Sequence, residues 1–276
     1  MEHTFASDIF SIESFAKPLV VLLDGEIYQL CEGKSPKKLF DLKERVKLTL
    51  VKDEVLYICT VAEVYRLEAG QLKGILKGEF EQVSAMDISS CRTYLGTGTY
   101  AGNVTMHNLV LRTKITYQEH EDSIVGLVIR NKSFYTASED GIINRTRIDE
   151  EEPRDTFGIG KLLRYLGIFN KVLLVIDAQG SLYTFDSTIN DFCRERKVLP
   201  GVTEVYPIKQ TIYTVHNQEI TELLPNRQIN KMPYPEMYFE GLFAYRNQLY
   251  PYSGCAILKW KSPKAEGEID DFFEDL

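Results

Sequence analysis

The chain has 276 residues, of which 44% are hydrophobic and 26% charged, a balance typical of soluble globular proteins. Its longest apolar run, residues 19–23, is far too short to cross a bilayer, and five scattered cysteines without CxxC spacing argue against a disulfide framework or a zinc site. The net charge of −8 arises largely from residues 266–276, which carry six acids and no base, so the rest of the chain is close to −2.

A strand–turn–strand unit recurs seven times along the chain. The first copy reads "VVLLDGEIYQL" (20–30) and the fourth "FYTASEDGIINRTRI" (134–148). We predict a two-residue turn in each copy, with Asp-Gly in type I′ geometry because both turn residues then need positive φ. The second turn residue recurs at intervals of 37 to 40 residues, at Gly25, Ala62, Gly102, Gly141, Gly180, Gln218 and Cys255.

Two further strands complete each unit. Between the first two hairpins lie "KKLFDL" (37–42) and "VKLTLV" (46–51), the outer strand of one unit and the inner strand of the next. Four strands in about 40 residues are typical of a propeller blade. Central strands such as "KVLLVI" (171–176) are apolar on both faces, as expected between two neighbouring blades. The sequence therefore predicts an all-β fold, a seven-bladed β-propeller.

The last unit lacks an outer strand in sequence order. Residues 3–8, "HTFASD", precede the inner strand of the first blade and are free to supply it. Closure of this kind leaves no open sheet edge around the ring. We therefore predict one propeller domain, residues 1–261, closed by the N-terminal strand, and a short acidic tail, residues 262–276.

Basic residues concentrate between positions 31 and 52, where seven Lys/Arg face three acids. Such a cluster is usually a solvated face, but it can also contact phosphate. The residues that would face RNA in the second case are Lys34, Lys37, Lys38, Lys43, Arg45 and Lys47, together with Arg145 and Arg147.

The sequence contains no motif for catalysis, a metal or a cofactor. "GTGTYAG" (96–102) lies inside a hairpin and precedes a strand, whereas a phosphate loop precedes a helix. The four histidines are scattered, and no GxSxG occurs. We therefore expect a non-catalytic protein that needs no cofactor or small-molecule substrate and binds no membrane.

The stretch "HEDSIVGLVIRNKSFYTASEDGIINRTRI" (120–148) resembles a WD repeat. His120, Ser138 and Asp140, followed by Gly141, take positions that in such repeats hydrogen-bond with a tryptophan six residues after the aspartate. Only the last unit keeps this tryptophan, because the seven positions read Leu30, Leu67, His107, Thr146, Phe185, Leu223 and Trp260.

Among WD-repeat proteins, the chain resembles the WD repeat-containing protein 55 family and its fungal relatives. The matching stretches are "VYRLEAGQLKGIL" (64–76), "QEHEDSIVGLVI" (118–129) with "YTASEDG" (135–141), "LLPNRQI" (223–229) and "DDFFEDL" (270–276), the last similar to a C-terminal DDFF motif. The chain departs from the family in two ways: its loops are short, and only Lys259, Lys261 and Lys264 remain of a longer basic stretch before DDFF.

This resemblance implies a nuclear, largely nucleolar scaffold that acts in ribosomal RNA production and ribosome assembly. Its partners would be pre-ribosomal proteins, with pre-rRNA as a further candidate, and the chain would be a monomer within a larger complex. Two alternatives stay open: a propeller that binds RNA directly, and a scaffold of another nuclear complex, in chromatin modification or the mitotic checkpoint.

The ending "GEIDDFFEDL" places two phenylalanines among acids after the predicted propeller. A frayed, solvated end is one interpretation. Against it stands the cost of leaving such side chains in water, since burying one is worth about 1.5–3 kcal/mol. We interpret the ending as a linear docking motif formed by Asp270, Asp271, Phe272, Phe273, Glu274, Asp275 and Leu276.

Overall fold

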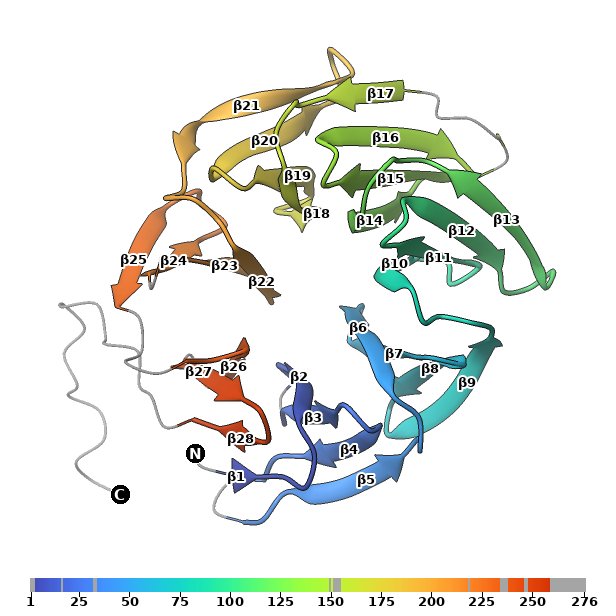
Figure 1. The fold of residues 1–276 in the computed structure, drawn as a ribbon, viewed down its shortest axis with the longest axis vertical. Coiled ribbons are helices and arrows are strands. Elements are labelled where there is room, and N and C mark those ends of the chain that lie inside the picture. The colour runs from blue at the N-terminus through green and yellow to red at the C-terminus, as the bar shows by residue number, and fades with distance from the viewer. Residues whose placement is uncertain are drawn as a thin grey trace.

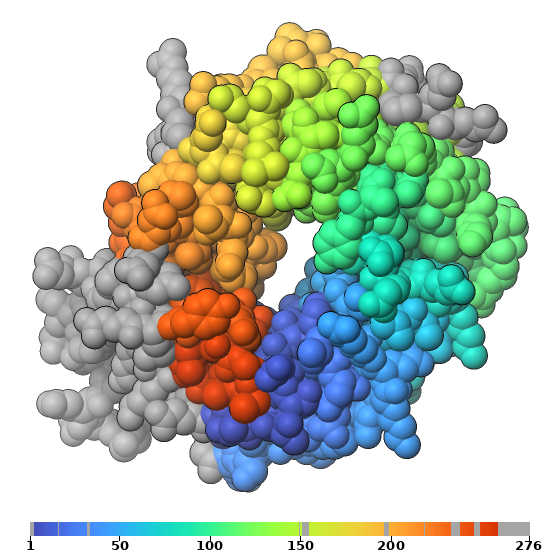
Figure 2. Space-filling view, viewed as in Figure 1, coloured from blue at the N-terminus to red at the C-terminus, as the bar shows by residue number. Residues whose placement is uncertain are grey.

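The computed structural model describes residues 3–258 apart from residues 16, 32–33, 149, 151–154, 218, 234–237 and 246–247. Seven antiparallel sheets of four strands each stand in a ring (Figure 1). The space-filling view shows an opening at the centre of this ring (Figure 2). The seven-bladed all-β propeller that the hairpin spacing predicts is therefore confirmed.

Each blade runs from an inner strand at the centre of the ring to an outer strand at its rim. The strands of blades 1 to 4 are β2 Ile9–Glu13, β3 Leu19–Leu22, β4 Glu26–Gln29 and β5 Lys37–Asp41; β6 Val46–Lys52, β7 Val55–Thr60, β8 Glu63–Glu68 and β9 Gln71–Lys77; β10 Val83–Ile88, β11 Tyr94–Thr99, β12 Asn103–Asn108 and β13 Thr113–Gln118; and β14 Ile124–Arg130, β15 Ser133–Ser138, β16 Ile142–Arg147 and β17 Asp155–Gly158.

Blades 5 to 7 continue in the same order, except that the outer strand of blade 7 comes from the N-terminus. Their strands are β18 Leu163–Phe169, β19 Val172–Asp177, β20 Ser181–Asp186 and β21 Asp191–Val198; β22 Glu204–Ile208, β23 Thr211–His216, β24 Glu219–Leu223 and β25 Ile229–Pro233; and β26 Gly241–Tyr245, β27 Gln248–Ser253, β28 Ala256–Ile257 and β1 His3–Thr4.

The N-terminal strand closes the ring. His3 pairs with Ile257 and Thr4 with Ala256, in antiparallel register. The Phe5 N–H extends the pairing by donating to the Cys255 carbonyl at 2.8 Å. The predicted closure is confirmed, and the pairing lies at the start of the predicted segment 3–8.

The turns between the second and third strands differ from the predicted type. In blade 4 three residues, Glu139 to Gly141, join β15 to β16, and the Gly141 N–H donates to the Ser138 carbonyl at 3.2 Å. Gly141 has a φ of +84°, whereas Asp140 is not among the residues with positive φ. The predicted two-residue type I′ turn is therefore wrong in blade 4, whereas in blade 2 two residues, Val61 and Ala62, do join β7 to β8, without positive φ. A right-handed turn followed by one left-handed glycine also matches the strand twist, and it needs positive φ at the glycine alone.

The core consists of seven apolar layers, one between each pair of neighbouring blades. Val20 and Leu22 of blade 1, for example, pack against Phe243 of blade 7, and all three are fully buried. Near the centre of the ring, an ion pair crosses blades 2 and 3, with Lys52 Nζ 2.7 Å from Asp87 Oδ1. Asp87 also accepts the Ile129 N–H of blade 4 at 2.7 Å. Packing between blades therefore dominates, and one buried carboxylate joins three of them.

Candidate docking groove between blades 2 and 3

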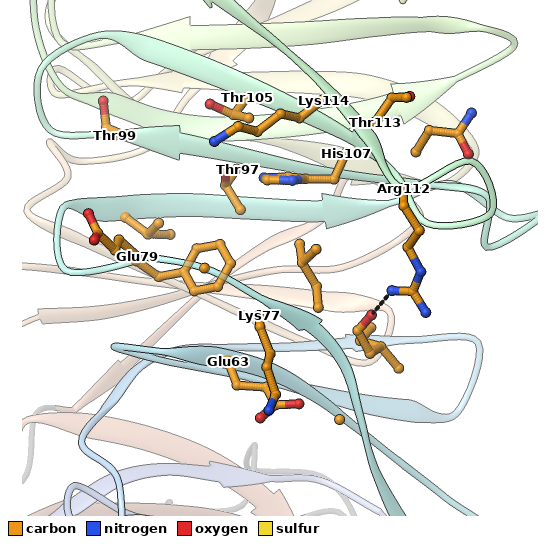
Figure 3. A pocket seen from close by; sticks show the side chains of 17 residues that line it. Glu63, Lys77, Glu79, Thr97, Thr99, Thr105, His107, Arg112, Thr113 and Lys114 are labelled. Carbon is orange, nitrogen blue, oxygen red and sulfur yellow. Dashed lines mark hydrogen bonds between the residues drawn. The ribbon is translucent and has the colours of Figure 1, made fainter.

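A groove of about 990 Å³ opens between blade 2 and blade 3 (Figure 3). One wall is the outer strand of blade 2, β9, with Gly74 and Lys77. The other wall is the face of blade 3 formed by β11, β12 and β13, with Thr97, His107 and Lys114. The groove is thus built from strands that are distant in sequence.

Small side chains on the blade 3 wall leave space for the groove. Thr97 stands opposite Thr105 across the strand pair, and both line the groove. On the facing wall the Glu63 side chain covers Gly74. The ring of Phe80 also lines the groove and packs edge-on against the His107 ring, with 6.2 Å between the ring centres.

Two polar groups inside the groove lack partners. Thr97 is only 3% exposed, yet its hydroxyl makes no hydrogen bond to another described residue. Neither ring nitrogen of His107 does so within the described ranges. Burial, assisted by the charge of Lys114, lowers the pKa of His107 to about 4. The imidazole is therefore neutral at pH 7 and can accept a hydrogen bond on one nitrogen.

Charged side chains surround the groove. Arg112 Nη1 donates to the Ile75 carbonyl at 3.1 Å and so links the two walls (Figure 3). Lys77 and Lys114 are exposed, and within the described part of the chain no acidic side chain lies within 4.0 Å of either ammonium group. Glu63 and Glu79 also line the groove, both from blade 2 or the segment that follows it. Each wall therefore carries one exposed lysine without an acidic partner among the described residues, Lys77 on β9 and Lys114 on β13.

The residues that match the WD pattern in blade 4 form a closed structural network. His120 Nδ1 lies 3.0 Å from Asp140 Oδ2, and the Thr136 hydroxyl lies 2.8 Å from His120 Nε2. Ser138, the hydroxyl that the WD resemblance places in this network, instead accepts the Asp140 N–H at 3.2 Å. The hydroxyl that contacts His120 lies two residues earlier on β15. At the tryptophan position, the Thr146 hydroxyl donates to Glu119 Oε1 at 2.8 Å.

The predicted RNA-facing residues do not form one surface. The outer strand β5 of blade 1 lies across the ring from β16, which carries Arg145 and Arg147 (Figure 1). Arg145 Nη1 contacts Asp155 Oδ2 at 3.2 Å and Asn190 Oδ1 at 3.0 Å, and its guanidinium lies over the Tyr135 ring. It therefore connects blades 4 and 5.

Several of the remaining basic residues are also paired with acids. Lys38 pairs with Glu26 and Asp41, Lys47 with Glu81 at 3.0 Å, and Arg147 with Glu150 at 3.4 Å. The exposed basic residues without such a pair in the described ranges are Lys34, Lys37, Lys43 and Arg45. RNA contact by these residues stays a prediction.

Residues 259–276 lie outside the described residues, so the docking motif at 270–276 and the last-blade tryptophan, Trp260, stay predictions. Within the described part of the chain, no group of three or more His, Cys, Asp or Glu side chains could hold a metal ion. That part also contains no helix long and apolar enough to span a membrane. The groove was not predicted from the sequence. The one signal for it is His107, which stands where three other repeats carry leucine.

No protein family model and no curated protein matches the chain. Solved structures match it in fold. One is the crystal structure of the computationally designed Ika8 protein, 13% identical, with a TM-score of 0.65 over 90% of this chain and 81% of that one. Another is a chain in the crystal structure of the Mitotic Checkpoint Complex, 12% identical, with a TM-score of 0.67 over 95% of this chain and 92% of that one. The chain therefore shares its propeller fold with these solved structures, and identities this low show the fold alone.

Proposed function

We propose that this protein is a non-catalytic scaffold that docks partner proteins, and that it serves the assembly of pre-ribosomal particles in the nucleolus. The observation that supports docking is the contrast between closed and open parts of the ring. Seven apolar layers pack the blades against each other, whereas the groove between blades 2 and 3 is open to solvent and carries the exposed ammonium groups of Lys77 and Lys114. A rigid ring with such a surface can bind proteins without moving.

The ribosomal part of the proposal is supported by the sequence stretches similar to the WD repeat-containing protein 55 family, above all the acidic ending at 270–276. The fold match to a chain of the Mitotic Checkpoint Complex supports the checkpoint alternative no better, because the match to a designed protein is nearly as good. Assembly factors of the pre-ribosome are therefore the partners we propose.

Affinity purification of the tagged chain tests this proposal. Pre-ribosomal proteins should co-purify, and should remain after RNase treatment if proteins, not pre-rRNA, hold the scaffold. Checkpoint or chromatin proteins in their place would contradict the ribosomal assignment. Binding of purified chain to RNA that falls steeply with added salt would favour the RNA-binding alternative.

The tail can be tested in the same experiment. Phe272→Ala with Phe273→Ala should leave the melting temperature unchanged and remove part of the co-purifying set, because the rings would anchor a partner. A matched control replaces only the neighbouring acids Glu266 and Glu268 with Gln. If the double phenylalanine variant recovers the same proteins as wild type, the docking-motif interpretation is wrong.

A further inference from the structure

The groove between blades 2 and 3 lies at a position that other blades fill from within. Counted from the second turn residue of each hairpin, His107 corresponds to Leu30, Leu67 and Leu223 of blades 1, 2 and 6. Those three leucines are 3%, 6% and 0% exposed and belong to the apolar layers. In blade 3 the polar His107 stands there instead, and the space beside it is open. The groove therefore lies beside the position at which three other blades carry a buried leucine and blade 3 carries a histidine.

The polar groups of blade 3 repeat those of blade 4 without their partners. Thr97 corresponds to Thr136 by the 39-residue offset between Gly102 and Gly141. In blade 4 the equivalent hydroxyl is bonded to a histidine ring, and the hydroxyl at the tryptophan position is bonded to Glu119. In blade 3 both Thr97 and His107 lack a hydrogen-bond partner among the described residues. Both groups can be reached by water, so an N–H donor bound in the groove would take the place of that water.

We propose that this groove takes the side chain of a tryptophan from an extended, acidic segment of a partner protein. The indole supplies a flat ring to lie against Phe80 and one N–H donor, which Thr97 or the neutral His107 accepts. Carboxylates next to the tryptophan pair with Lys114, the exposed ammonium on the blade 3 wall. This inference rests on the docking part of the proposed function and is independent of its ribosomal part.

Other occupants fit these groups less well. A phenylalanine would fill the space but leave Thr97 and His107 without a donor. A basic segment would meet Lys77, Arg112 and Lys114, which outnumber Glu63 and Glu79 in the lining. A free indole would use the ring site but not Lys114. Each of these alternatives predicts a different result in the experiment below.

The experiment measures binding of the tripeptide acetyl-Asp-Trp-Asp-amide, labelled as 5-fluorotryptophan, to the full chain by ¹⁹F NMR titration. We expect saturable binding, weakened about fivefold by Thr97→Val, because one neutral hydrogen bond is worth about 1 kcal/mol. Thr214→Val is the matched control, since Thr214 is a buried strand threonine of blade 6 that is 2% exposed. Lys114→Glu should also weaken binding, and more at low salt.

The decisive variant is His107→Trp, which fills the groove from within. This variant should not bind the peptide, and its melting temperature should be higher than that of wild type. If it does not fold, a second peptide with 2-naphthylalanine in place of tryptophan tests the proposal. Because that side chain has no N–H, Thr97→Val should not weaken its binding. Absence of binding at millimolar peptide, or binding unchanged by Thr97→Val and His107→Trp, would overturn the proposal. N-acetyltryptophanamide that binds as tightly as the tripeptide would show a small-molecule site and likewise contradict it. None of these outcomes depends on which proteins co-purify with the chain.

Discussion

Three glycines, two in hairpin turns and one at the end of β17, allow backbone strain and steric contact to be measured separately. Gly70 has a φ of +76° with nothing within 4 Å of the position its Cβ would take. Gly102 has nearly the same φ, +78°, but there a Cβ would lie 2.2 Å from the His120 carbonyl oxygen. Gly158 has neither feature, with an ordinary φ and open space. Alanine at these three positions therefore separates the two costs.

We expect the order of destabilisation Gly158→Ala, Gly70→Ala, Gly102→Ala. The first variant should be neutral or stabilising by up to about 1 kcal/mol, since alanine reduces the entropy of the unfolded chain. Left-handed backbone costs an alanine about 1–2 kcal/mol, so Gly70→Ala should lose about 1 kcal/mol net. Gly102→Ala adds a contact with backbone that cannot move without shifting the His120 segment, and should lose about 2–4 kcal/mol.

Urea unfolding of the three variants gives these differences directly, provided that the slope with urea is unchanged. At about 2–4 °C per kcal/mol, the melting temperatures should follow the same order. Gly141→Val, with a φ of +84° and a Cβ 2.9 Å from the Lys161 carbonyl oxygen, should lose about 1–3 kcal/mol. A Gly102→Ala variant no less stable than Gly70→Ala would refute the close approach of blade 3 to the His120 segment.

Three further predictions follow from the charges and the ring closure. Asp87→Asn should lower the free energy of unfolding in urea by about 3 kcal/mol, because it leaves Lys52 unpaired. Glu26→Gln at the rim should lower it by less than about 1 kcal/mol. Equal losses in the two variants would contradict the central ion pair. Burial holds the pKa of His107 at about 4, below its unfolded value near 6.5, so its contribution to stability is complete above pH 6.5 and declines as pH falls toward 4. Imidazole ¹⁵N shifts should show that midpoint, and a midpoint near 6.5 would mean an open, hydrated groove. Deleting residues 1–8 removes the outer strand of blade 7 and should lower the urea midpoint, and an unchanged midpoint would contradict the closure.

The architecture could be predicted from the sequence because the hairpin turns recur at regular intervals. Glycine stands at the second turn position in four of the seven hairpins, for example Gly25 and Gly102, and the regular spacing leaves room for two further strands in each unit. The pairing of residues 3–4 with β28 could also be predicted, since the last unit lacked one strand. The turn type could not be predicted, because Asp-Gly suits both a two-residue turn and the end of a three-residue one.

Side-chain partners were harder to predict than strands. Thr136 and Ser138 are two residues apart on β15 and so share one face, and only the distance to His120 decides which hydroxyl bonds to it. Arg145 was expected to face RNA, yet it binds Asp155 and Asn190 of neighbouring elements, the second of which lies 45 residues later. Contacts between blades depend on how sheets face each other, and no local pattern encodes that.

The groove is the clearest case of information that no single residue carries. His107 alone indicates only that this repeat departs from the WD pattern, since blade 4 also has a polar residue, Thr146, at the equivalent position. Blade 4 nevertheless stays closed, because Glu119 occupies the space and accepts the Thr146 hydroxyl. Blade 3 opens where a histidine stands beside the opposed threonines Thr97 and Thr105 of two neighbouring strands. A leucine at position 107, as in three other blades, would bury apolar surface worth about 1.5–3 kcal/mol. The ring therefore forgoes that apolar burial at position 107, beside which the groove is open to solvent.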